Sequence, residues 1–469
     1  FAYKLTLRFF LPPKLALRGE LVTTLCFFTS LYSHKQYYSN YTLTARRHAN
    51  NYVLKLPLGY YIIKGASMTL SEELSWRGFI NQTTYADITE LDKAPLTFYW
   101  GVDPSADSMT IGNLAPAMMI RHFINYGHKP ILLVGGATGM IGDPDGKKQE
   151  RDLKTVEEID KNVNGLSAQY KTIFAGSDFV LVNNYDWFKE INYLDFLRNI
   201  GKHVSMTQML DREFVKARIG EGGEGISYAE FSYSLIQGYD FLHLFRTKGA
   251  TLQVAGADQW GNSIAGVELI RRLEGAEAHI FTAPLIVNRQ TGVKFGKSEG
   301  GAIWLDPTKT SPYKFYQFWL NVDDETAKDL VKIYTLLDKD TVEALIADHE
   351  TNPGERALQK TLAREVTDIV HSRERRESVE RVTAALFGGT INELTDDDIG
   401  TLSAEIPTVV PQSAISALVA TGLASSNGEA RRLICGGAIS VNGQKITEDF
   451  GVASKSLIKK GKNSYILVR

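Results

Sequence analysis

The alternation of short apolar runs with longer helical stretches limits the fold of this chain more than any other sequence feature. Five runs are rich in apolar and β-branched residues: 96–102, 129–136, 179–184, 251–256 and 282–288. Near-continuous apolar runs of this kind are typical of parallel strands that are covered on both faces. Between the first two runs, Ile111, Leu114, Ala115 and Met118 have the spacing of one apolar helix stripe. The pattern predicts an α/β fold with a Rossmann-like, doubly wound parallel sheet.

Glycine-containing loops follow the first two predicted strands, and they are the first places to look for a ligand site. In doubly wound sheets, ligands bind beyond the carboxyl ends of the strands. The two loops are residues 101–108, GVDPSADS, and residues 135–148, GGATGMIGDPDGKK. Neither loop has the spacing of a P-loop (GxxxxGKS or GxxxxGKT) or of a dinucleotide fingerprint (GxGxxG). The sequence therefore disfavours a P-loop kinase and a Rossmann dehydrogenase.

Charge is segregated along the chain, although the 469 residues together carry a formal net charge of only −2. Residues 1–67 carry +8 and residues 412–469 carry +5, which leaves −15 for residues 68–411. A small basic segment attached to an acidic body favours a polyanionic partner such as nucleic acid. A solvated charged face is the alternative interpretation.

Residues 1–67 contain no methionine, and the first one in the chain is Met68. We interpret 1–67 as a non-native upstream extension, which predicts a cytoplasmic protein. The alternative is an organellar transit peptide, because such peptides are also basic and poor in acidic residues. Apolar runs in this segment are shorter than the roughly 20 residues that span a bilayer, so we expect no membrane partner. The two cysteines, Cys26 and Cys435, are too few and too distant for a disulfide framework or a thiolate zinc site.

Several ordered motifs resemble one family, the bacterial-type tyrosyl-tRNA synthetases, which are class I aminoacyl-tRNA synthetases. The segment 103–114, DPSADSMTIGNL, resembles that family's version of the HIGH motif, and 294–298, KFGKS, resembles its version of KMSKS. Further similar segments are NNYDWF, FLRNIGKH, FSYSLIQGYDF, ADQWGN and the C-terminal NGEARRLICGGAISVNGQKI. The resemblance covers essentially residues 68–469.

The resemblance implies a domain order and an activity. We expect a catalytic domain at 68–290, the KFGKS loop with an α-helical anticodon-side domain at 291–386, a linker at 387–411 and an α+β S4-like RNA-binding domain at 412–469. The implied enzyme is an ATP-dependent tyrosine–tRNA ligase that forms tyrosyl-adenylate and then charges tRNA(Tyr). L-tyrosine and ATP are substrates, Mg²⁺ accompanies ATP and pyrophosphate, no protein-bound metal is expected, and the family is homodimeric.

The resemblance also implies residues for the tyrosine subsite. Tyr99 and Asp240 match the pair that binds the phenolic hydroxyl. The α-ammonium group is assigned to Tyr233, Gln237 and Asp143, and the carboxylate lies near Gln259. Tyr233, Gln237 and Asp240 have the spacing i, i+4 and i+7, which places them on one helix face.

The remaining implied sites concern ATP, catalysis and RNA. ATP-binding positions are Gly101, Asp103, Gly112, Lys147, Arg151, Gly256, Asp258 and Lys297. Catalytic positions are Thr110, Gly112, Asn113, Lys294, Lys297 and Ser298. RNA-binding positions are Arg431, Arg432 and Lys445. Glycines permit a close backbone approach, and lysines stabilise the charge that develops on transferring phosphates.

The chain departs from the family pattern near the HIGH-like motif, which reads TIGN. Thr110 and Asn113 replace the two histidines, and we expect either side chain to donate to a phosphate oxygen. Trp100 replaces a small residue beside the ribose, and we expect Pro116 in the first helical turn. These departures motivate a second hypothesis, a catalytically weakened RNA-binding paralogue. A tryptophan ligase is a third hypothesis, and Asp240 paired with Tyr99 argues against it.

Overall fold

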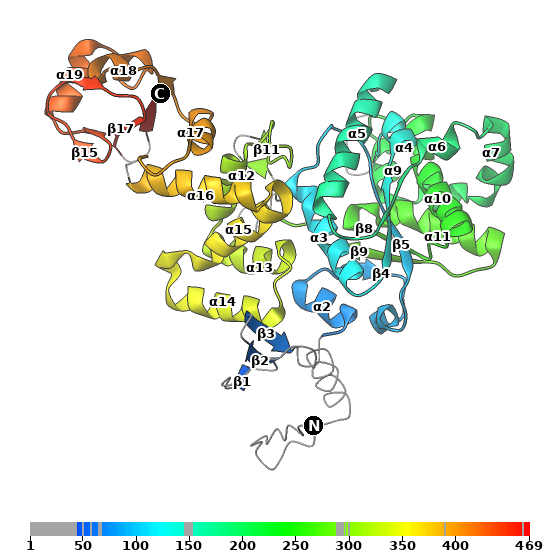
Figure 1. Ribbon diagram of the computed structural model, residues 1–469. Helices are drawn as coiled ribbons and strands as arrows, with labels where there is room; N and C mark the ends of the chain where they lie inside the picture. Colours follow the sequence, from blue (N-terminus) through cyan, green and yellow to red (C-terminus); the bar gives the residue numbers. More distant parts are fainter. Residues whose placement is uncertain are drawn as a thin grey trace, which may run out of the picture. The chain divides into compact units, whose positions relative to one another are not determined.

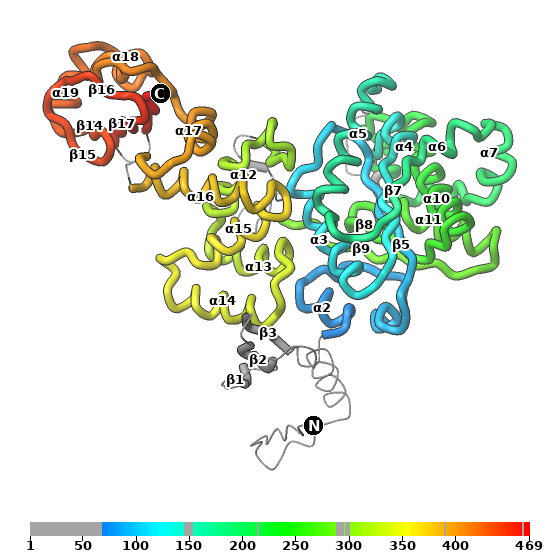
Figure 2. The backbone as a smooth tube through the Cα atoms, viewed as in Figure 1, coloured from blue at the N-terminus to red at the C-terminus, as the bar shows by residue number. Residues whose placement is uncertain are grey.

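The computed structural model describes residues 45–48, 51–56, 59–63, 68–144, 153–287, 295, 297–298, 301–388, 391–461 and 464–469 (Figures 1 and 2). The chain separates into two units, residues 1–67 and residues 68–469. In the first unit, three strands form an antiparallel sheet in the order β1–β2–β3: Ala45–His48, Asn51–Leu56 and Gly59–Ile63. Most of the expected extension at 1–67, with Cys26, lies outside the described residues.

The second unit contains a six-stranded sheet in the order β4–β9–β8–β5–β6–β7. Its strands are β4 (Gln82–Thr83), β5 (Thr97–Val102), β6 (Lys129–Val134), β7 (Val180–Asn183), β8 (Leu252–Gly256) and β9 (His279–Ala283). All neighbours pair in parallel except β4, which is antiparallel to β9. The prediction of a doubly wound parallel sheet is therefore confirmed. The strand order reverses beside β5, because β6 lies on one side of it and β8 on the other.

Helices cover both faces of this sheet. The largest are α3 (Ile111–Asn125), α5 (Val156–Ile173), α10 (Tyr228–Lys248) and α11 (Trp260–Glu274). Phe98 and Trp100 of β5 belong to a hydrophobic cluster with α3 and α5, whereas Tyr99 belongs to a cluster with α10 and α11. This division follows from the two-residue period of a strand. It explains why near-continuous apolar runs form these strands.

Local sequence determines where α10 begins and ends, and this matters because α10 carries part of the site. The Ser227 side chain accepts from the Glu230 N–H at the first turn, and Gly249 ends the helix with φ 68°. A side chain on Gly266 of α11 would place its Cβ 2.7 Å from the Phe241 Cβ. The two helices therefore pack closely only because this residue is glycine.

The position expected for Pro116 was wrong. Helix α3 begins at Ile111, so Pro116 lies inside the helix, in the second turn rather than the first. Without an N–H, Pro116 cannot donate to the Gly112 carbonyl four residues earlier. The carbonyl of Gly112 thus loses its usual helical donor.

Shorter helices complete the region around the sheet. They are α2 (Leu70–Arg77), α4 (Gly136–Ile141), α6 (Tyr185–Phe188), α7 (Tyr193–Asn199), α8 (Met206–Leu210) and α9 (Glu213–Ile219). The strands β10 (Lys297–Ser298) and β11 (Gly301–Ala302) form a separate antiparallel pair.

A helical region follows: α12 (Pro312–Leu320), α13 (Asp324–Tyr334), α14 (Lys339–Thr351), α15 (Ala357–His371) and α16 (Arg373–Gly388). One hydrophobic cluster extends from Leu70 and Ile111 to Trp319, Tyr334 and Val366. The helical region therefore shares a core with α2 and α3. Arg77 strengthens this junction by donating to carbonyl oxygens at the end of α13, including that of Thr335 at 3.0 Å.

The C-terminal region has its own small core. It contains α17 (Asp396–Ser403), α18 (Ala414–Ala420), α19 (Asn427–Cys435), β12 (Thr408–Val409), β13 (Gln412–Ser413), β14 (Ile439–Val441), β15 (Gln444–Lys445), β16 (Gly451–Val452), β17 (Ser456–Lys460) and β18 (Ser464–Val468). The order β12–β18–β17–β14–β15 makes a five-stranded sheet. Leu457 and Leu467 of that sheet also pack with Val382 of α16 and Leu402 of α17. In the described part of the chain, no helix is long and apolar enough to span a membrane.

Candidate active site

A cavity of about 380 Å³ lies at the carboxyl ends of β5 and β8, beside the reversal in strand order. This is where the topology of a doubly wound sheet predicts a ligand site. The sequence-predicted residues that line it are Tyr99, Gly101, Asp103, Thr110, Gly112, Asn113, Asp143, Tyr233, Gln237, Asp240, Gly256, Asp258 and Gln259. Lys147, Arg151 and Lys294 lie outside the described residues. For Lys297 and Ser298 the structure gives the backbone of β10, paired with β11.

Asp240 lies on the wall of the cavity and is only 2% exposed. The Asn184 Nδ2 donates to its Oδ2 at 3.1 Å, and the Trp187 Nε1 donates to its Oδ1 at 2.9 Å. Burial raises the pKa of Asp240 to about 8, and these two neutral donors only partly oppose it. Sequence reasoning quoted NNYDWF as a family segment but did not assign these two side chains. The signal that could have found Asn184 was its position as a polar residue at the end of the predicted strand, immediately after β7.

Three residues that line the cavity carry a buried polar atom with no partner among the described residues: the Tyr99 Oη, the Gln237 Oε1 and the Gln253 Oε1. Tyr99 comes from β5 and Gln237 from α10, and both line the cavity. Burial, followed by the nearby Asp240 charge, raises the pKa of Tyr99 well above its ordinary value. Buried polar groups in folded proteins almost always have hydrogen-bond partners. Unpaired atoms facing a cavity therefore indicate a place for polar groups of a ligand.

Asp103, which the resemblance assigned to ATP, accepts a hydrogen bond from Tyr233, which it assigned to the amino acid. The Tyr233 Oη donates to its Oδ2 at 2.7 Å, and the Thr138 Oγ1 donates to its Oδ1 at 2.6 Å. Burial and the charges of Asp103 and Asp143 raise the pKa of Tyr233, which stays protonated and remains a donor. The positions that the resemblance assigned to the amino acid and to the nucleotide thus meet at a single carboxylate. Thr138 was missed because only the tertiary structure brings α4 to this loop.

Asp143 also lines the cavity, and a second set of polar side chains surrounds it. The Gln259 Nε2 donates to Asp143 Oδ2 at 2.6 Å, and the Asn262 Nδ2 donates to Oδ1 at 3.3 Å. Asn262 is 1% exposed and belongs to the ADQWGN segment, but sequence reasoning gave it no role. These contacts fix the Asp143 carboxylate before any ligand binds.

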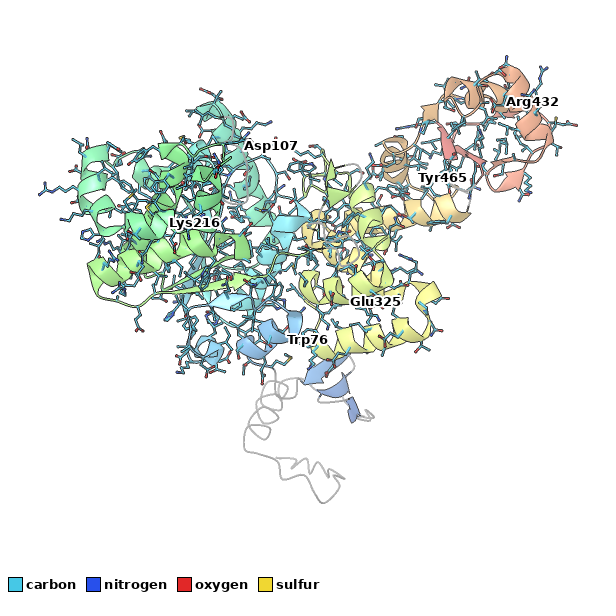
Figure 3. All side chains as sticks on the ribbon, turned by 180° about the vertical axis from the view of Figure 1, so that it is seen from behind. Trp76, Asp107, Lys216, Glu325, Arg432 and Tyr465 are labelled. Atoms are coloured by element: carbon cyan, nitrogen blue, oxygen red, sulfur yellow. The ribbon has the colours of Figure 1, made fainter. Side chains whose placement is uncertain are left out.

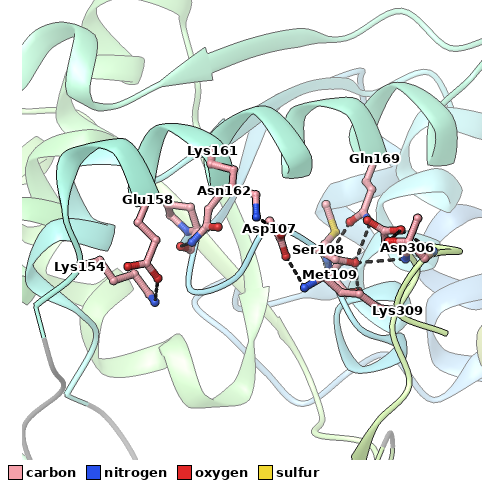
Figure 4. Close-up of polar contacts among 12 residues, drawn as sticks. Asp107, Ser108, Met109, Lys154, Glu158, Lys161, Asn162, Gln169, Asp306 and Lys309 are labelled. Atoms are coloured by element: carbon pink, nitrogen blue, oxygen red, sulfur yellow. Dashed lines mark hydrogen bonds and ion pairs between the residues drawn. The ribbon is translucent and has the colours of Figure 1, made fainter.

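The loop that leads into α3 is held from two sides (Figure 4). Asp107 forms ion pairs with Lys161 of α5 at 2.9 Å and with Lys309 at 2.6 Å. These lysines, Lys309 first, lower the pKa of Asp107 to about 2. The Gln169 Oε1 accepts from the Met109 N–H at 2.7 Å, which fixes the residue immediately before the TIGN motif. The start of α3 is therefore a well-supported part of the site.

At the TIGN motif, the Asn113 side chain folds back on Thr110. The Thr110 N–H and Oγ1 both donate to Asn113 Oδ1, at 3.0 and 3.2 Å. A Cβ at Gly112 would lie 3.4 Å from the Thr110 Oγ1, an ordinary van der Waals distance, so this arrangement does not itself require glycine. Trp100 is 3% exposed, and its ring packs edge-on against Tyr170 with centroids 5.4 Å apart. Most of the bulk of Trp100 is thus accommodated in the core beneath the cavity.

Carboxylates line the cavity, but they do not form a metal centre of their own. Within the described ranges, no group of three or more His, Cys, Asp or Glu side chains is arranged to hold a metal ion. Asp103 and Asp143 already accept two hydrogen bonds each. Both carboxylates are thus already engaged with donors from the protein.

The predicted RNA-binding residues lie far from the cavity in sequence and form no part of its lining. Arg431 and Arg432 are exposed on α19, and Lys445 is exposed on β15. Figure 3 shows Arg432 pointing outward from the C-terminal region. Within α19, Ala430 and Ile434 face the small core instead.

The switch-point cavity, the parallel sheet and the following helical region define the fold of a class I aminoacyl-tRNA synthetase. The family model of "tRNA synthetases class I (W and Y)" matches residues 91–388. The model of the "Tyrosine--tRNA ligase SYY-like C-terminal domain" matches residues 398–468.

Individual relatives agree with these family models. The tyrosine–tRNA ligase of Flavobacterium psychrophilum is 44% identical over 85% of this chain and 96% of its own length. That of Bacteroides thetaiotaomicron is 45% identical over 86% of this chain and 99% of its own. A crystal structure of the Aspergillus nidulans mitochondrial tyrosyl-tRNA synthetase, truncated at its C-terminus, superposes with a TM-score of 0.63 at 28% identity, covering 69% of this chain and 95% of that one. The chain belongs to the tyrosine–tRNA ligase family.

Proposed function

We propose that this protein activates L-tyrosine with ATP and transfers it to tRNA(Tyr). The observation that carries the proposal is the buried, unpaired Tyr99 Oη beside the Asp240 carboxylate. A phenol satisfies both groups at once, because it accepts from Tyr99 and donates to Asp240. An indole has a single N–H donor and no acceptor, so it leaves Tyr99 unpaired. Phenylalanine leaves the Tyr99 hydroxyl unpaired and offers no proton to Asp240, which costs binding free energy.

The same cavity supports roles for the other end of the amino acid. Tyr233, Gln237 and Asp143 are proposed to bind the α-ammonium group, and Gln259 lies near the carboxylate. The tyrosine carboxylate then attacks the α-phosphorus of ATP, and pyrophosphate leaves. No covalent enzyme intermediate is needed, since the protein positions the reactants and stabilises charge.

The nucleotide half is proposed to extend from Gly101 and Gly112 to Gly256 and Asp258. ATP enters with Mg²⁺ bound to its phosphates, and Asp103 lies between the two substrates. We propose that pyrophosphate is bound by the remaining cationic side chains and one hydroxyl, which are Lys147, Arg151, Lys294, Lys297 and Ser298. Positive side chains at these positions neutralise the charge that builds up as pyrophosphate departs.

In the second step, a ribose hydroxyl at the 3′ end of the tRNA attacks the tyrosyl carbonyl, and AMP leaves. We propose that residues 68–290 catalyse both steps, that 291–386 contribute the KFGKS loop and anticodon-side contacts, and that a linker at 387–411 leads to an RNA-binding domain at 412–469. The exposure of Arg431, Arg432 and Lys445 supports phosphate contacts by this last domain.

We also propose that the protein acts as a cytoplasmic homodimer. Tyr193 and Leu194 of α7 and Tyr228 of α10 are 59%, 71% and 63% exposed, and the hydroxyls of the two tyrosines lie 3.4 Å apart. Such a group of exposed apolar side chains favours a protein interface. Sedimentation equilibrium at micromolar concentration is expected to give twice the 52.2 kDa chain mass, and a monomer under these conditions would refute the dimer.

Tyrosine-dependent ATP–pyrophosphate exchange on residues 68–469 tests the central proposal, with tryptophan and phenylalanine as controls. Exchange with tyrosine alone supports a tyrosine ligase in which TIGN is a working motif. Exchange with tryptophan instead would overturn the phenol assignment. If the folded protein binds tRNA but supports no exchange, the RNA-binding paralogue becomes the better explanation.

A further inference from the structure

Tyr334 is the last residue of α13, and its side chain connects the helical region with the start of α3. The side chain is 0% exposed, and its Oη donates to the Ile111 carbonyl at 3.0 Å. Burial raises the pKa of Tyr334, so the hydroxyl stays protonated and remains a donor. A carbonyl oxygen has two lone pairs, so that of Ile111 can accept this bond in addition to a helical one. Tyr334 therefore bonds the first residue of α3 to the helical region.

The backbone of Ile111 is also fixed on its N–H side. The Ile111 N–H donates to the Ile303 carbonyl at 3.1 Å, and the preceding Thr110 forms an antiparallel bridge with Trp304. Residues 303–304 come directly after β11, which pairs with β10 of the KFGKS motif. Both polar groups of the Ile111 backbone are thus bonded to segments that follow this motif in the chain. Because the two bonds lie on opposite sides of one residue, a shift of the start of α3 breaks at least one of them.

The ring of Tyr334 contacts the KFGKS motif through Phe295. The centroids of these two rings are 6.2 Å apart, and the Trp319 ring of α12 lies 4.8 Å from that of Tyr334 and 5.9 Å from that of Phe295. Phe295 lines the cavity and is 9% exposed. Its carbonyl oxygen lies close to the start of α3, because a Cβ at Gly112 would be 3.8 Å from it. One side chain therefore contacts both motifs, the TIGN motif by its hydroxyl and the KFGKS motif by its ring.

The end of α13 is itself fixed, so the Tyr334 side chain starts from a stationary backbone. The buried Arg77 of α2 donates to the carbonyl oxygens of Lys332, Thr335 and Leu337, at 2.5, 3.0 and 2.6 Å. These three bonds lie on both sides of Tyr334 in sequence. A side chain whose own backbone is held in this way can determine the separation of the two segments that it contacts.

We infer that Tyr334 is a positioning residue for adenylate formation, which holds Ile111 and Phe295, and with them the TIGN and KFGKS motifs, at a fixed separation. This inference rests on the proposed function. Tyr334 is not among the described residues that line the cavity, so it acts through the two residues that it contacts. Tyr99 of the tyrosine subsite belongs to a different hydrophobic cluster from Tyr334. Loss of the Tyr334 contact therefore affects the chemical step and not the binding of tyrosine.

Y334F in residues 68–469 removes only the hydroxyl, and tyrosine-dependent pyrophosphate exchange measures the effect. We expect kcat to fall about tenfold with the KM for tyrosine within about twofold of the unsubstituted protein, because slightly misplaced groups lose part of their effect on the transition state. Y316F is the matched control, since the buried Tyr316 Oη donates to Glu380 Oε1 at 3.2 Å inside the helical region. We expect Y316F to leave kcat unchanged. Urea unfolding of both variants corrects the rates for the folded fraction.

A double-mutant cycle with F295L tests whether the hydroxyl and the ring act together. F295L removes the aromatic contact with Tyr334, and we expect it to lower kcat about tenfold. If Tyr334 sets one separation between the two motifs, breaking either contact already releases it. The double variant is then expected to lose about tenfold in kcat and not the product of about 100-fold.

Each outcome supports or overturns the inference. Unchanged kcat in Y334F at full folding overturns it, and so does an equal loss of kcat in Y316F, which would indicate a general effect of lost stability. If the losses of Y334F and F295L multiply in the double variant, the two contacts are independent and the inference is wrong. Absence of tyrosine-dependent exchange in the unsubstituted protein would refute the proposed function and the inference with it.

Discussion

Two buried aspartates, Asp240 in the cavity and Asp398 at the start of α17, show how the same side chain serves different purposes. They are 2% and 0% exposed. Asp240 accepts from two neutral donors, and burial raises its pKa to about 8. Burial acts in the same direction on Asp398, but hydrogen bonds led by those of Arg381 outweigh it and hold the pKa below its usual range. Burial thus prevails at Asp240, where the donors are neutral, and the hydrogen bonds prevail at Asp398, where the principal donor is charged.

The two aspartates also differ in whether the polar groups around them all have hydrogen-bond partners. The Asp398 carboxylate accepts from Arg381 at 2.8 and 2.9 Å, from Ser378 at 2.5 Å and from the Thr395 N–H at 3.1 Å. These contacts join α16 to α17 and complete a capping box. Beside Asp240, in contrast, the Tyr99 hydroxyl has no partner among the described residues. A satisfied buried carboxylate indicates a structural role, whereas one beside unpaired donors indicates a ligand site.

The largest expected effect is that of D240N. The substitution keeps the shape but replaces the carboxylate that accepts the phenolic proton. A hydrogen bond to a charged group contributes about 1.5–3 kcal/mol, so we expect kcat/KM for tyrosine in pyrophosphate exchange to fall about 100-fold. No buried charge is lost from the empty cavity at neutral pH, because the raised pKa keeps Asp240 largely protonated there. If D240N discriminates against phenylalanine as well as the unsubstituted protein does, Asp240 does not recognise the phenol, and the contrast with the structural Asp398 is lost.

Substituting Arg431 and Arg432 with alanine is expected to have the next largest effect, on tRNA charging alone. We expect kcat/KM for tRNA to fall about tenfold and the dependence of tRNA affinity on salt to weaken, because each lost phosphate contact reduces the number of released counterions. Pyrophosphate exchange should stay unchanged. Alanine at Lys93, an exposed lysine on the catalytic body, is the matched charge control, and equal loss in both assays would contradict the division of labour.

The alanine substitutions at Arg431 and Arg432 test the role of RNA contacts more directly than a deletion of residues 412–469 would. Leu457 and Leu467 pack with Val382 and Leu402, so deletion would expose a hydrophobic cluster on α16 and α17. An effect of deletion on exchange would therefore not distinguish lost RNA contacts from lost stability.

For D398N we expect lower stability and unchanged chemistry. Removing one partner of a buried ion pair is costly, but Arg381 is 47% exposed, so the cost is moderated by solvent. We expect the free energy of unfolding to fall by about 2 kcal/mol in urea titrations, with pyrophosphate exchange per folded molecule unaltered. A reduced kcat at full folding would place Asp398 in the catalytic machinery and so remove the contrast.

The smallest effects concern the pH dependence of stability, where the two aspartates have opposite signs. In the unfolded chain each has a pKa of about 3.9. The raised pKa of Asp240 means that the folded state binds more protons between about pH 4 and pH 8, so its contribution to stability decreases as pH rises through this window. The lowered pKa of Asp398 contributes stability that is present above about pH 4 and is lost as pH falls further.

Urea unfolding across pH 3–8 checks both signs. In D240N, the free energy of unfolding should decrease less as pH rises from about 4 to about 8. In D398N, it should decrease less as pH falls below about 4. Identical pH profiles for the unsubstituted protein and D240N would mean that Asp240 is ionised in the empty cavity at neutral pH.

Local pattern predicted the strand-end loops and the shared helix face of the site, whereas the family resemblance supplied the individual residue assignments. Tyr233, Gln237 and Asp240 line one cavity as their spacing predicted. The sequence did not reveal that Asn184 and Trp187 bind Asp240, since these residues lie 53–56 positions away in the chain. Long-range pairs of this kind have no periodic signal.

By itself, the sequence placed four of the five parallel strands, but it placed the fifth at 282–288, whereas β9 spans His279–Ala283. It also supplied the ordered motifs. These features depend on neighbouring residues and on a fixed backbone period. Only the tertiary structure decided the chemical state of the side chains within them. It directed the Thr110 hydroxyl to Asn113, packed Trp100 against Tyr170, and surrounded two aspartates with different partners. Hydrogen bonding and desolvation act over a few ångströms in space, so these properties depend on which distant segments the fold brings together.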